Sequence, residues 1–121
     1  MKSVRLDRLL SNLGYGSRRE MQTLVRSGAV RFDDAVFDDP QAPIAIVDDL
    51  SARLRLAGAP LDPIYPLTLM LHKPIGAVCS HREPGRSVYE LLPERWRRRR
   101  PTLSSIGRLD GDTTGLLVIT D

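Results

Sequence analysis

The residues best suited to chemistry lie in a short polar run near the end of the sequence, G-R-L-D-G-D-T-T at residues 107–114. Asp110 and Asp112 are its carboxylates, and Arg108 stands two residues before the first of them. A carboxylate can act as a nucleophile or take up a proton. Two carboxylates on one loop without a third ligand make a poor metal site, and Asp, Gly and Thr are also common turn formers. By itself, the run leaves catalysis and a plain turn as alternatives.

A second group of candidates is basic and lies near the N-terminus. Residues 1–31 hold seven Lys or Arg against two Asp or Glu, residues 32–66 hold two against seven, and residues 67–121 hold nine against six. A basic module beside an acidic segment is typical of a protein that contacts a phosphate backbone. A solvated surface with scattered ion pairs is the alternative.

Composition limits the class of protein. With 41% hydrophobic and 27% charged residues, the chain has the balance of a soluble globular protein. No apolar stretch approaches the roughly 20 residues of a membrane helix, and the first residues lack the apolar core of a secretory signal. We therefore expect a cytoplasmic protein without membrane contact. The single cysteine, Cys79, has no disulfide partner and is expected to be a small buried hydrophobe.

The first module is predicted to contain two short helices followed by small strands. The first helix has apolar residues at helical spacing and stops at Gly14. These residues are Leu6, Leu9, Leu10 and Leu13. Ser17 and Glu20 form a capping box for the second helix, which ends near Gly28. We expect a hairpin from residues 29–32 and 36–37 around a turn at residues 33–34, and a third strand at residues 51–56.

Residues 59–66 contain three prolines and are predicted to be a linker that cannot pair regularly in a sheet. Beyond it, residues 67–71 are predicted to form a strand with residues 77–80 as its partner, and residues 87–92 one or two helical turns. The four arginines at 97–100 are predicted to be too repulsive for burial and to form an exposed loop, either solvated or in contact with phosphate. Residues 115–120 are predicted to form a strand.

Two blocks of the first module resemble a known RNA-binding domain. They are R-L-D-R-L-L-S-N-L-G-Y-G-S-R-R-E at residues 5–20 and V-R-S-G-A-V at residues 25–30, and they resemble the S4 domain, first described in a ribosomal protein. The resemblance implies that structured RNA is contacted by Arg5, Arg8, Ser17, Arg18, Arg19 and Arg26. Guanidinium groups pair with phosphate oxygens, and a capped helix N-terminus attracts anions, so these residue types suit that ligand.

Two further runs resemble ribosomal small-subunit pseudouridine synthases of the A type. The signature of that family is similar to G-R-L-D-G-D-T-T-G-L-L-V-I-T at residues 107–120. An earlier segment of the family's sequences is similar to L-H-K-P-I-G-A-V-C-S at residues 71–80. The resemblance implies an isomerase that converts a uridine of ribosomal RNA to pseudouridine without metal or organic cofactor. Asp110 would be the catalyst. Arg108 would fill the space of a flipped-out nucleotide or keep the carboxylate ionised. Lys73 is assigned to RNA phosphate, with exposure to water as the alternative.

The resemblance implies an α+β architecture in two parts. Residues 1–58 would form the S4-type domain, with two helices and a small antiparallel sheet, and residues 67–121 the beginning of an α+β catalytic domain with a mixed, mainly antiparallel sheet. Because such domains continue further, we expect residues 115–120 to lack sheet neighbours and this chain to bind RNA but turn over little. The implied partner is ribosomal RNA or a ribosomal subunit assembly intermediate. The competing hypothesis is a non-catalytic RNA-binding adaptor.

Overall fold

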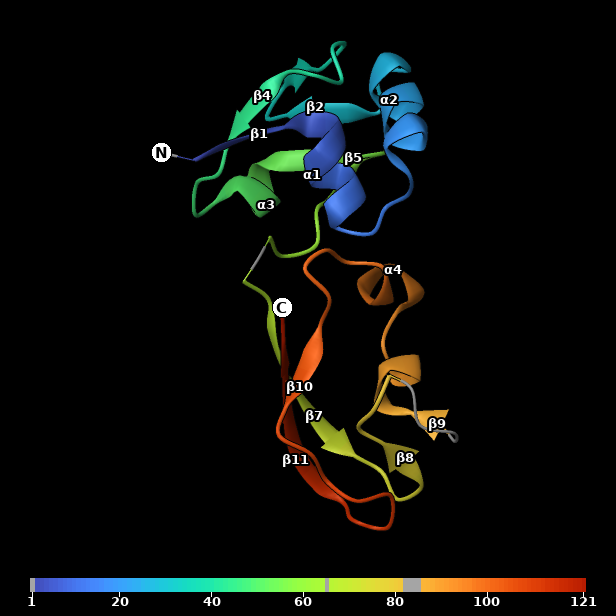
Figure 1. Ribbon diagram of the computed structural model, residues 1–121. Coiled ribbons are helices and arrows are strands. Elements are labelled where there is room, and N and C mark those ends of the chain that lie inside the picture. The colour runs from blue at the N-terminus through green and yellow to red at the C-terminus, as the bar shows by residue number, and fades with distance from the viewer. Residues whose placement is uncertain (1, 65, 82–85) are drawn as a thin grey trace. The chain divides into compact units, whose positions relative to one another are not determined.

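The computed structural model describes residues 2–64, 66–81 and 86–121 (Figure 1). The chain divides into two compact units, Met1–Ile64 and Tyr65–Asp121. Each unit combines short helices with small, mainly antiparallel sheets, which confirms the predicted α+β fold class. Within the described ranges, no helix has the length and apolar character needed to cross a membrane. The domain limits 1–58 and 67–121 stay a prediction.

The first unit begins with the two predicted helices, α1 (Leu6–Asn12) and α2 (Arg18–Arg26). The four leucines of the predicted apolar stripe are all fully buried, and each such side chain contributes about 1.5–3 kcal/mol through burial. The amide of Glu20 donates to Ser17 Oγ at 3.1 Å, and the amide of Ser17 donates to Glu20 Oε1 at 3.0 Å. The predicted capping box is therefore confirmed, and it sets the start of α2.

Two antiparallel sheets complete this unit. The larger has the strand order β3-β2-β5-β6. Its strands are β2 (Val30–Phe32), β3 (Ala35–Val36), β5 (Leu54–Leu56) and β6 (Ala59–Pro60). The smaller pairs β1 (Ser3–Arg5) with β4 (Pro43–Ala45). The predicted hairpin of the first module is confirmed as β2 and β3, which are antiparallel neighbours.

Two expectations for this unit are wrong. The strand predicted from residue 51 begins only at residue 54, because Leu50–Arg53 forms a helical turn, α3, with Leu50 buried. The amides of Ala52 and Arg53 donate to the carbonyl of Asp49. The predicted linker also does pair in part: β6 lies beside β5. A proline is tolerated there because an edge strand does not need its N–H for a further neighbour.

The second unit is built on a three-stranded antiparallel sheet of order β10-β11-β7. Its strands are β7 (Thr68–Lys73), β10 (Ser104–Ile106) and β11 (Gly115–Thr120). The strand expected at residues 115–120 is present, but the expectation that it would lack neighbours is wrong. It is the central strand, paired on one side with β10 and on the other with β7.

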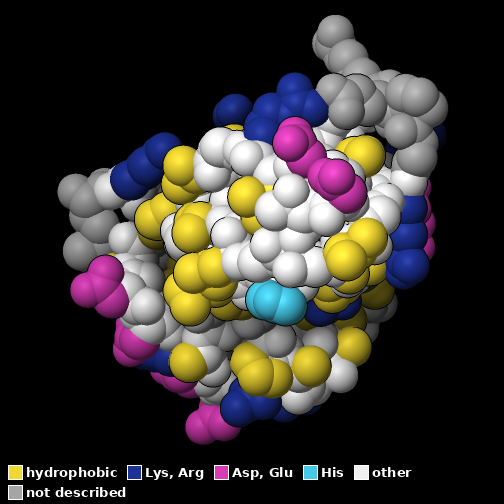
Figure 2. Space-filling model, turned by 90° about the horizontal axis from the view of Figure 1, so that it is seen from below, with side chains coloured by type: hydrophobic (Ala, Val, Ile, Leu, Met, Phe, Trp, Pro, Cys, Tyr) yellow, Lys and Arg dark blue, Asp and Glu magenta, His cyan; other side chains and the backbone are white. Residues whose placement is uncertain are grey.

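One face of this sheet remains apolar and open. Met70, Ile106 and Leu116 are 74%, 63% and 61% exposed. Val118 lies between two of them in register, opposite Ile106 on one side and Met70 on the other. Figure 2 shows hydrophobic side chains exposed in several places on the surface seen from below, among polar side chains and backbone. This side of the sheet therefore presents an exposed apolar surface.

The other face packs on a small core with short elements around it. These elements are β8 (Ala77–Val78), β9 (Arg86–Ser87), the 3-10 helix η1 (Val88–Leu91) and α4 (Glu94–Arg97). Residues 77–78 pair in parallel with β9, so their predicted pairing with the preceding strand is wrong; β7 pairs with β11 instead. Cys79 is buried in the core, as predicted.

The arginine run at 97–100 is only partly exposed, which corrects the prediction that these like charges are too repulsive for burial. The side chain of Arg99 is 1% exposed, and its Nη2 lies 3.1 Å from Asp121 Oδ2. The other oxygen of Asp121 accepts the amide of Leu67 at 2.9 Å. A buried charge is retained when it is paired and hydrogen-bonded. Arg99 thus has a structural role, whereas Arg97, Arg98 and Arg100 are exposed.

Arg99→Ala should lower the free energy of unfolding of the second unit by about 3–5 kcal/mol, because it leaves the Asp121 carboxylate buried without its counterion. Arg98→Ala is the matched control: it removes a neighbouring arginine that pairs with Glu94 at the surface, so the expected loss is only about 0–1 kcal/mol. Urea unfolding followed by circular dichroism measures both. Equal losses would contradict a structural role specific to Arg99.

Candidate functional site

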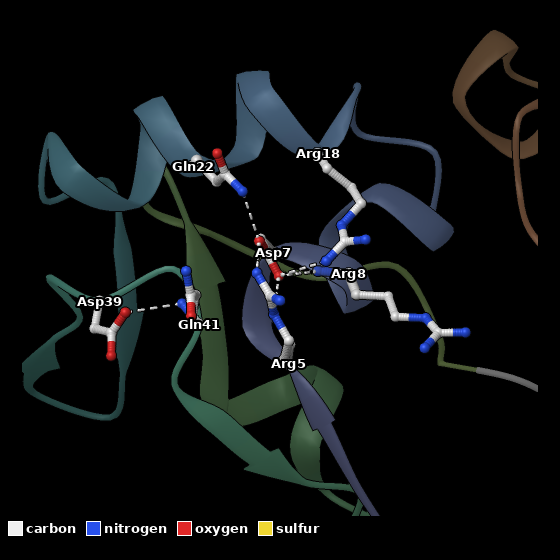
Figure 3. A network of polar contacts seen from close by, with 7 residues as sticks. All are labelled: Arg5, Asp7, Arg8, Arg18, Gln22, Asp39 and Gln41. Carbon is white, nitrogen blue, oxygen red and sulfur yellow. Dashed lines mark hydrogen bonds and ion pairs between the residues drawn. The ribbon is translucent and has the colours of Figure 1, made fainter.

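Two basic residues of the first unit, Arg5 and Arg18, lie around one buried carboxylate, that of Asp7 (Figure 3). The Asp7 side chain is 0% exposed. Arg5 donates to both of its oxygens, from Nε at 3.2 Å and from Nη2 at 2.8 Å. The backbone amide of Arg8 donates at 2.7 Å and Gln22 Nε2 at 2.9 Å. Four donor groups therefore satisfy a carboxylate that water does not reach.

These contacts join the two helices. Gln22 and Arg18 come from α2, and Arg18 Nη2 lies 3.9 Å from Asp7 Oδ1. In Figure 3 the Arg18 side chain reaches toward Asp7, whereas the Arg8 side chain extends away from it. The side chains of Arg5 and Arg18 stay 42% and 51% exposed. Two guanidinium groups are thus held by one acid and are still open to a ligand.

The same contacts determine the charge state of Asp7. Burial by itself would raise the pKa of this carboxyl group. The hydrogen bonds from Gln22, Arg5 and the amide of Arg8, together with the positive charge of Arg5, outweigh burial and hold the pKa below its ordinary value of 3.8. Asp7 is therefore ionised at neutral pH and acts as a fixed negative centre between the arginines.

The remaining predicted RNA contacts of this unit are placed differently. Arg8, Arg19 and Arg26 have exposed side chains. Ser17 is occupied by the capping box, whose Glu20 carboxylate already accepts the Ser17 amide. Part of the anion-attracting end of α2 is therefore taken by a residue of the chain itself.

Asp7 was absent from the predicted site residues. A signal for it existed, because Asp7 is the sole acidic residue among the first 19 and stands within the basic R-L-D-R run. Gln22 carried no such signal, since only the folded helices bring it to Asp7.

Asp110 lies on the loop at residues 107–114, between β10 and β11, and its side chain is exposed, as is that of Arg108. The amide of Thr113 donates to the Asp110 carbonyl at 3.0 Å, so residues 110–113 form a turn. Asp112 and Thr113 therefore lie within this turn. Gly107 opens the loop with φ of +80°, a conformation that favours glycine.

The backbone on either side of Asp110 is anchored. The amide of Leu109 donates to Cys79 Sγ at 3.4 Å, and the Leu109 side chain packs against the core. The carbonyl of Gly111 accepts the amide of Gly76 at 2.6 Å. The loop therefore presents the Asp110 carboxylate to solvent from a backbone that is held at both neighbouring residues.

Lys73 helps to hold the same loop, which corrects its predicted contact with RNA. Its side chain is fully buried. The ammonium donates to the carbonyls of Pro74 at 2.9 Å and Ala77 at 2.8 Å, with a longer contact of 3.5 Å to that of Gly111. A lysine ammonium has three donors, and all three point to backbone oxygens. In this arrangement Lys73 is not available to a phosphate group.

Comparison with known proteins gives matches in both units. Residues 4–55 match the S4 domain family. The chain is 39% identical over 121 residues to "Ribosomal small subunit pseudouridine synthase A" of Pseudomonas aeruginosa, covering 98% of this chain and 49% of the relative. It is 38% identical over 120 residues to an "Uncharacterized RNA pseudouridine synthase" of Bacillus subtilis, covering 98% and 48%.

A third relative is "Ribosomal large subunit pseudouridine synthase B" of Vibrio vulnificus, 31% identical over 131 residues, which cover 96% of this chain and 36% of the relative. The chain thus spans half or less of the length of these curated relatives. A solved structure described as a pseudouridylate synthase aligns with 27% identity and a TM-score of 0.43 over 98% of this chain and 48% of its own.

Because the pKa of Asp7 is lowered, the contribution of this residue to the free energy of unfolding should depend on pH. The ionised carboxylate stabilises the fold fully above its ordinary pKa of 3.8, and this contribution is lost as the pH falls from there through the lower pKa of the folded state. The stability difference between wild type and Asp7→Asn should therefore be largest near neutral pH and shrink below about 3.8. Urea unfolding at a series of pH values measures it. The exposed Asp39 supplies the control, Asp39→Asn, and a difference for Asp7→Asn that is constant with pH would contradict the prediction.

Lys73→Met should loosen the loop that carries Asp110, because three carbonyl groups lose a donor. The contact to the Ala77 carbonyl is buried, and an unsatisfied buried polar group costs about 1–3 kcal/mol. We expect faster hydrogen exchange at the amide of Gly76, which donates to the Gly111 carbonyl. Exchange measured by NMR tests this, with the exposed Lys2→Met as the matched control. An unchanged rate at Gly76 would show that Lys73 does not support the loop.

Proposed function

We propose that this chain supplies the RNA-binding module and the first catalytic portion of a ribosomal-RNA pseudouridine synthase. Two findings support the proposal: residues 4–55 match the S4 domain, and nearly the whole chain is similar to the N-terminal half of such synthases. The first unit would bind folded RNA, and the second would bring Asp110 to the uridine. The observation that supports this most directly is the exposed Asp110 carboxylate on a loop anchored at both neighbours.

The proposed reaction rearranges bonds without changing the composition of the nucleotide. The bond between uracil N1 and ribose C1′ breaks, a bond between C5 and C1′ forms, C5 gives up its proton, and N1 gains one. A carboxylate suits either of two roles: it can attack C1′ as a nucleophile, or it can take the proton from C5. Asp110 has the side chain and the exposure that both roles need.

The uridine has to leave the base stack before its atoms can be reached, which costs a few kcal/mol that contacts with the protein must offset. Arg108 is exposed and stands two residues before Asp110 on the same loop. Its guanidinium plane could stack in the space left by the extruded base. We therefore keep Arg108 as a proposed partner of Asp110 in substrate handling.

Binding of the RNA is proposed to use the arginines of α1 and α2. Arg5 and Arg18 are held by Asp7 and remain exposed, and Arg8, Arg19 and Arg26 are exposed around them. Structured RNA is recognised mainly through its shape and backbone, so cations at fixed positions suit it better than mobile ones. The buried Asp7 supplies that fixation.

The proposed substrate is small-subunit ribosomal RNA, either free or within a ribosomal subunit assembly intermediate in the cytoplasm. The choice of subunit follows the relatives, since the small-subunit synthase is 39% identical and the large-subunit synthase 31%. A role in ribosome biogenesis would follow from that substrate.

Two variants of the complete protein test the proposal. Asp110→Asn should abolish formation of pseudouridine, measured by mass spectrometry of ribosomal RNA, while RNA affinity stays nearly constant. Arg18→Ala combined with Arg19→Ala should weaken binding and lower the slope of log affinity against log salt by about 2, because two phosphate groups would no longer be neutralised by arginine.

Asp112→Asn is the matched control for the loop and should keep most of the activity, because Asp112 is assigned to the turn alone. Undiminished turnover by Asp110→Asn would overturn the catalytic proposal. RNA binding without any turnover by the complete unsubstituted protein would instead favour the non-catalytic adaptor.

A further inference from the structure

Two arginines face each other across the larger sheet of the first unit. The register of β2 and β5 places Arg31 directly opposite Arg55, and both residues are exposed. Opposite residues of an antiparallel pair project from the same face of the sheet, with Cβ atoms about 4.5–5.5 Å apart, and like charges in these positions destabilise the sheet. The unliganded sheet therefore carries an unfavourable electrostatic interaction at this point.

The neighbours of Arg31 and Arg55 do not relieve the repulsion between these two positive charges. The row across the sheet runs from Val36 through Arg31 and Arg55 to Pro60, so the residues at its ends are uncharged. Among the described residues, neither guanidinium forms an ion pair; the contact found is from Arg55 Nη1 to the carbonyl of Gly58, at 3.3 Å. Both positive charges are thus available to a ligand.

The arginines line a surface hollow of about 560 Å³, together with backbone at Gly28, Ala57 and Gly58. Asp33 and Asp34 also line it. The Asp33 carboxylate accepts two hydrogen bonds from Arg53, at 2.7 and 3.2 Å, and these bonds hold its pKa below the ordinary value.

Asp33 is therefore already neutralised by Arg53. The charges that remain at the hollow are two positive ones, on Arg31 and Arg55, and one negative one, on Asp34. An anion of phosphate type would find two guanidinium groups and one opposing carboxylate there. Its negative charge would attract both arginines and offset the repulsion between them.

We propose that Arg31 and Arg55 form a phosphate-binding pair for the RNA backbone, separate from the arginines on α1 and α2. The inference rests on the proposed function, because it assumes that the first unit binds RNA. It extends the RNA-binding surface from the helices onto the exposed face of the sheet. It also gives Arg55, which belongs to the acidic segment at residues 32–66, a role that the charge distribution along the sequence does not suggest.

The test compares variants of this chain, with a hairpin RNA that copies a segment of bacterial small-subunit ribosomal RNA as the probe. Arg31→Gln and Arg55→Gln should each lower the slope of log affinity against log salt by about 1. Without RNA, the same variants should be as stable as the wild type or more so in low-salt buffer, because the repulsion is gone.

Asp33→Asn combined with Arg53→Gln is the matched control, since it removes the neighbouring ion pair and leaves the net charge of the unit unchanged. Arg53 pairs with Asp33 and lies over the Phe32 ring, 4.4 Å from its centroid. This variant should keep the wild-type salt slope and lose stability. Arg31→Lys and Arg55→Lys keep the charge and should retain the wild-type slope.

Each outcome decides between the alternatives. A wild-type salt slope in both glutamine variants would overturn the phosphate pair and leave the proposed function standing. An equal drop for Asp33→Asn with Arg53→Gln would overturn it too, by showing that the salt slope responds to any loss of charged groups beside the sheet. Failure of the unsubstituted chain to bind the hairpin would overturn the proposed function itself.

Discussion

The ionised carboxylate of Asp7 is the constraint on which the RNA-binding unit depends. It lies where water does not reach, so its charge is tolerated only because Arg5, Gln22 and the amide of Arg8 all donate to it. The same acid reduces the repulsion between Arg5 and Arg18, two like charges at the end of β1 and on α2. One buried acid thereby stabilises the helix pair and keeps a cationic surface in place.

The second unit also contains buried charged side chains, but these are cations, whereas the first unit buries an anion. Lys73 and Arg99 are cations inside a small core, one surrounded by backbone carbonyls and the other paired with Asp121. Both interactions join segments that are distant in sequence: Lys73 reaches the loop that follows Asp110, and Arg99 reaches the end of β11. Such contacts are directional, so they determine where a loop lies more narrowly than apolar packing does.

Local patterns predicted the helices better than the sheets. The leucine stripe and the capping box of Ser17 with Glu20 involve residues within one or two helical turns, and both are present. Strand pairing is decided between distant segments. The sequence motif could not show that β7 would pair with β11 and leave residues 77–78 to β9, or that Leu50–Arg53 would turn helical before β5 begins.

The sequence by itself determined the α+β class, the two helices and the exposed polar loop around Asp110, because each follows from short-range spacing or from a contiguous motif. Only the tertiary structure decided which charges are inside. Lys73, Arg99 and Asp7 resemble surface residues in sequence, and each is buried with at least one partner that only folding brings to it: Gly111, Asp121 and Gln22, respectively. Arg31 and Arg55 face each other for the same reason: register between strands, which no local pattern encodes, places them there.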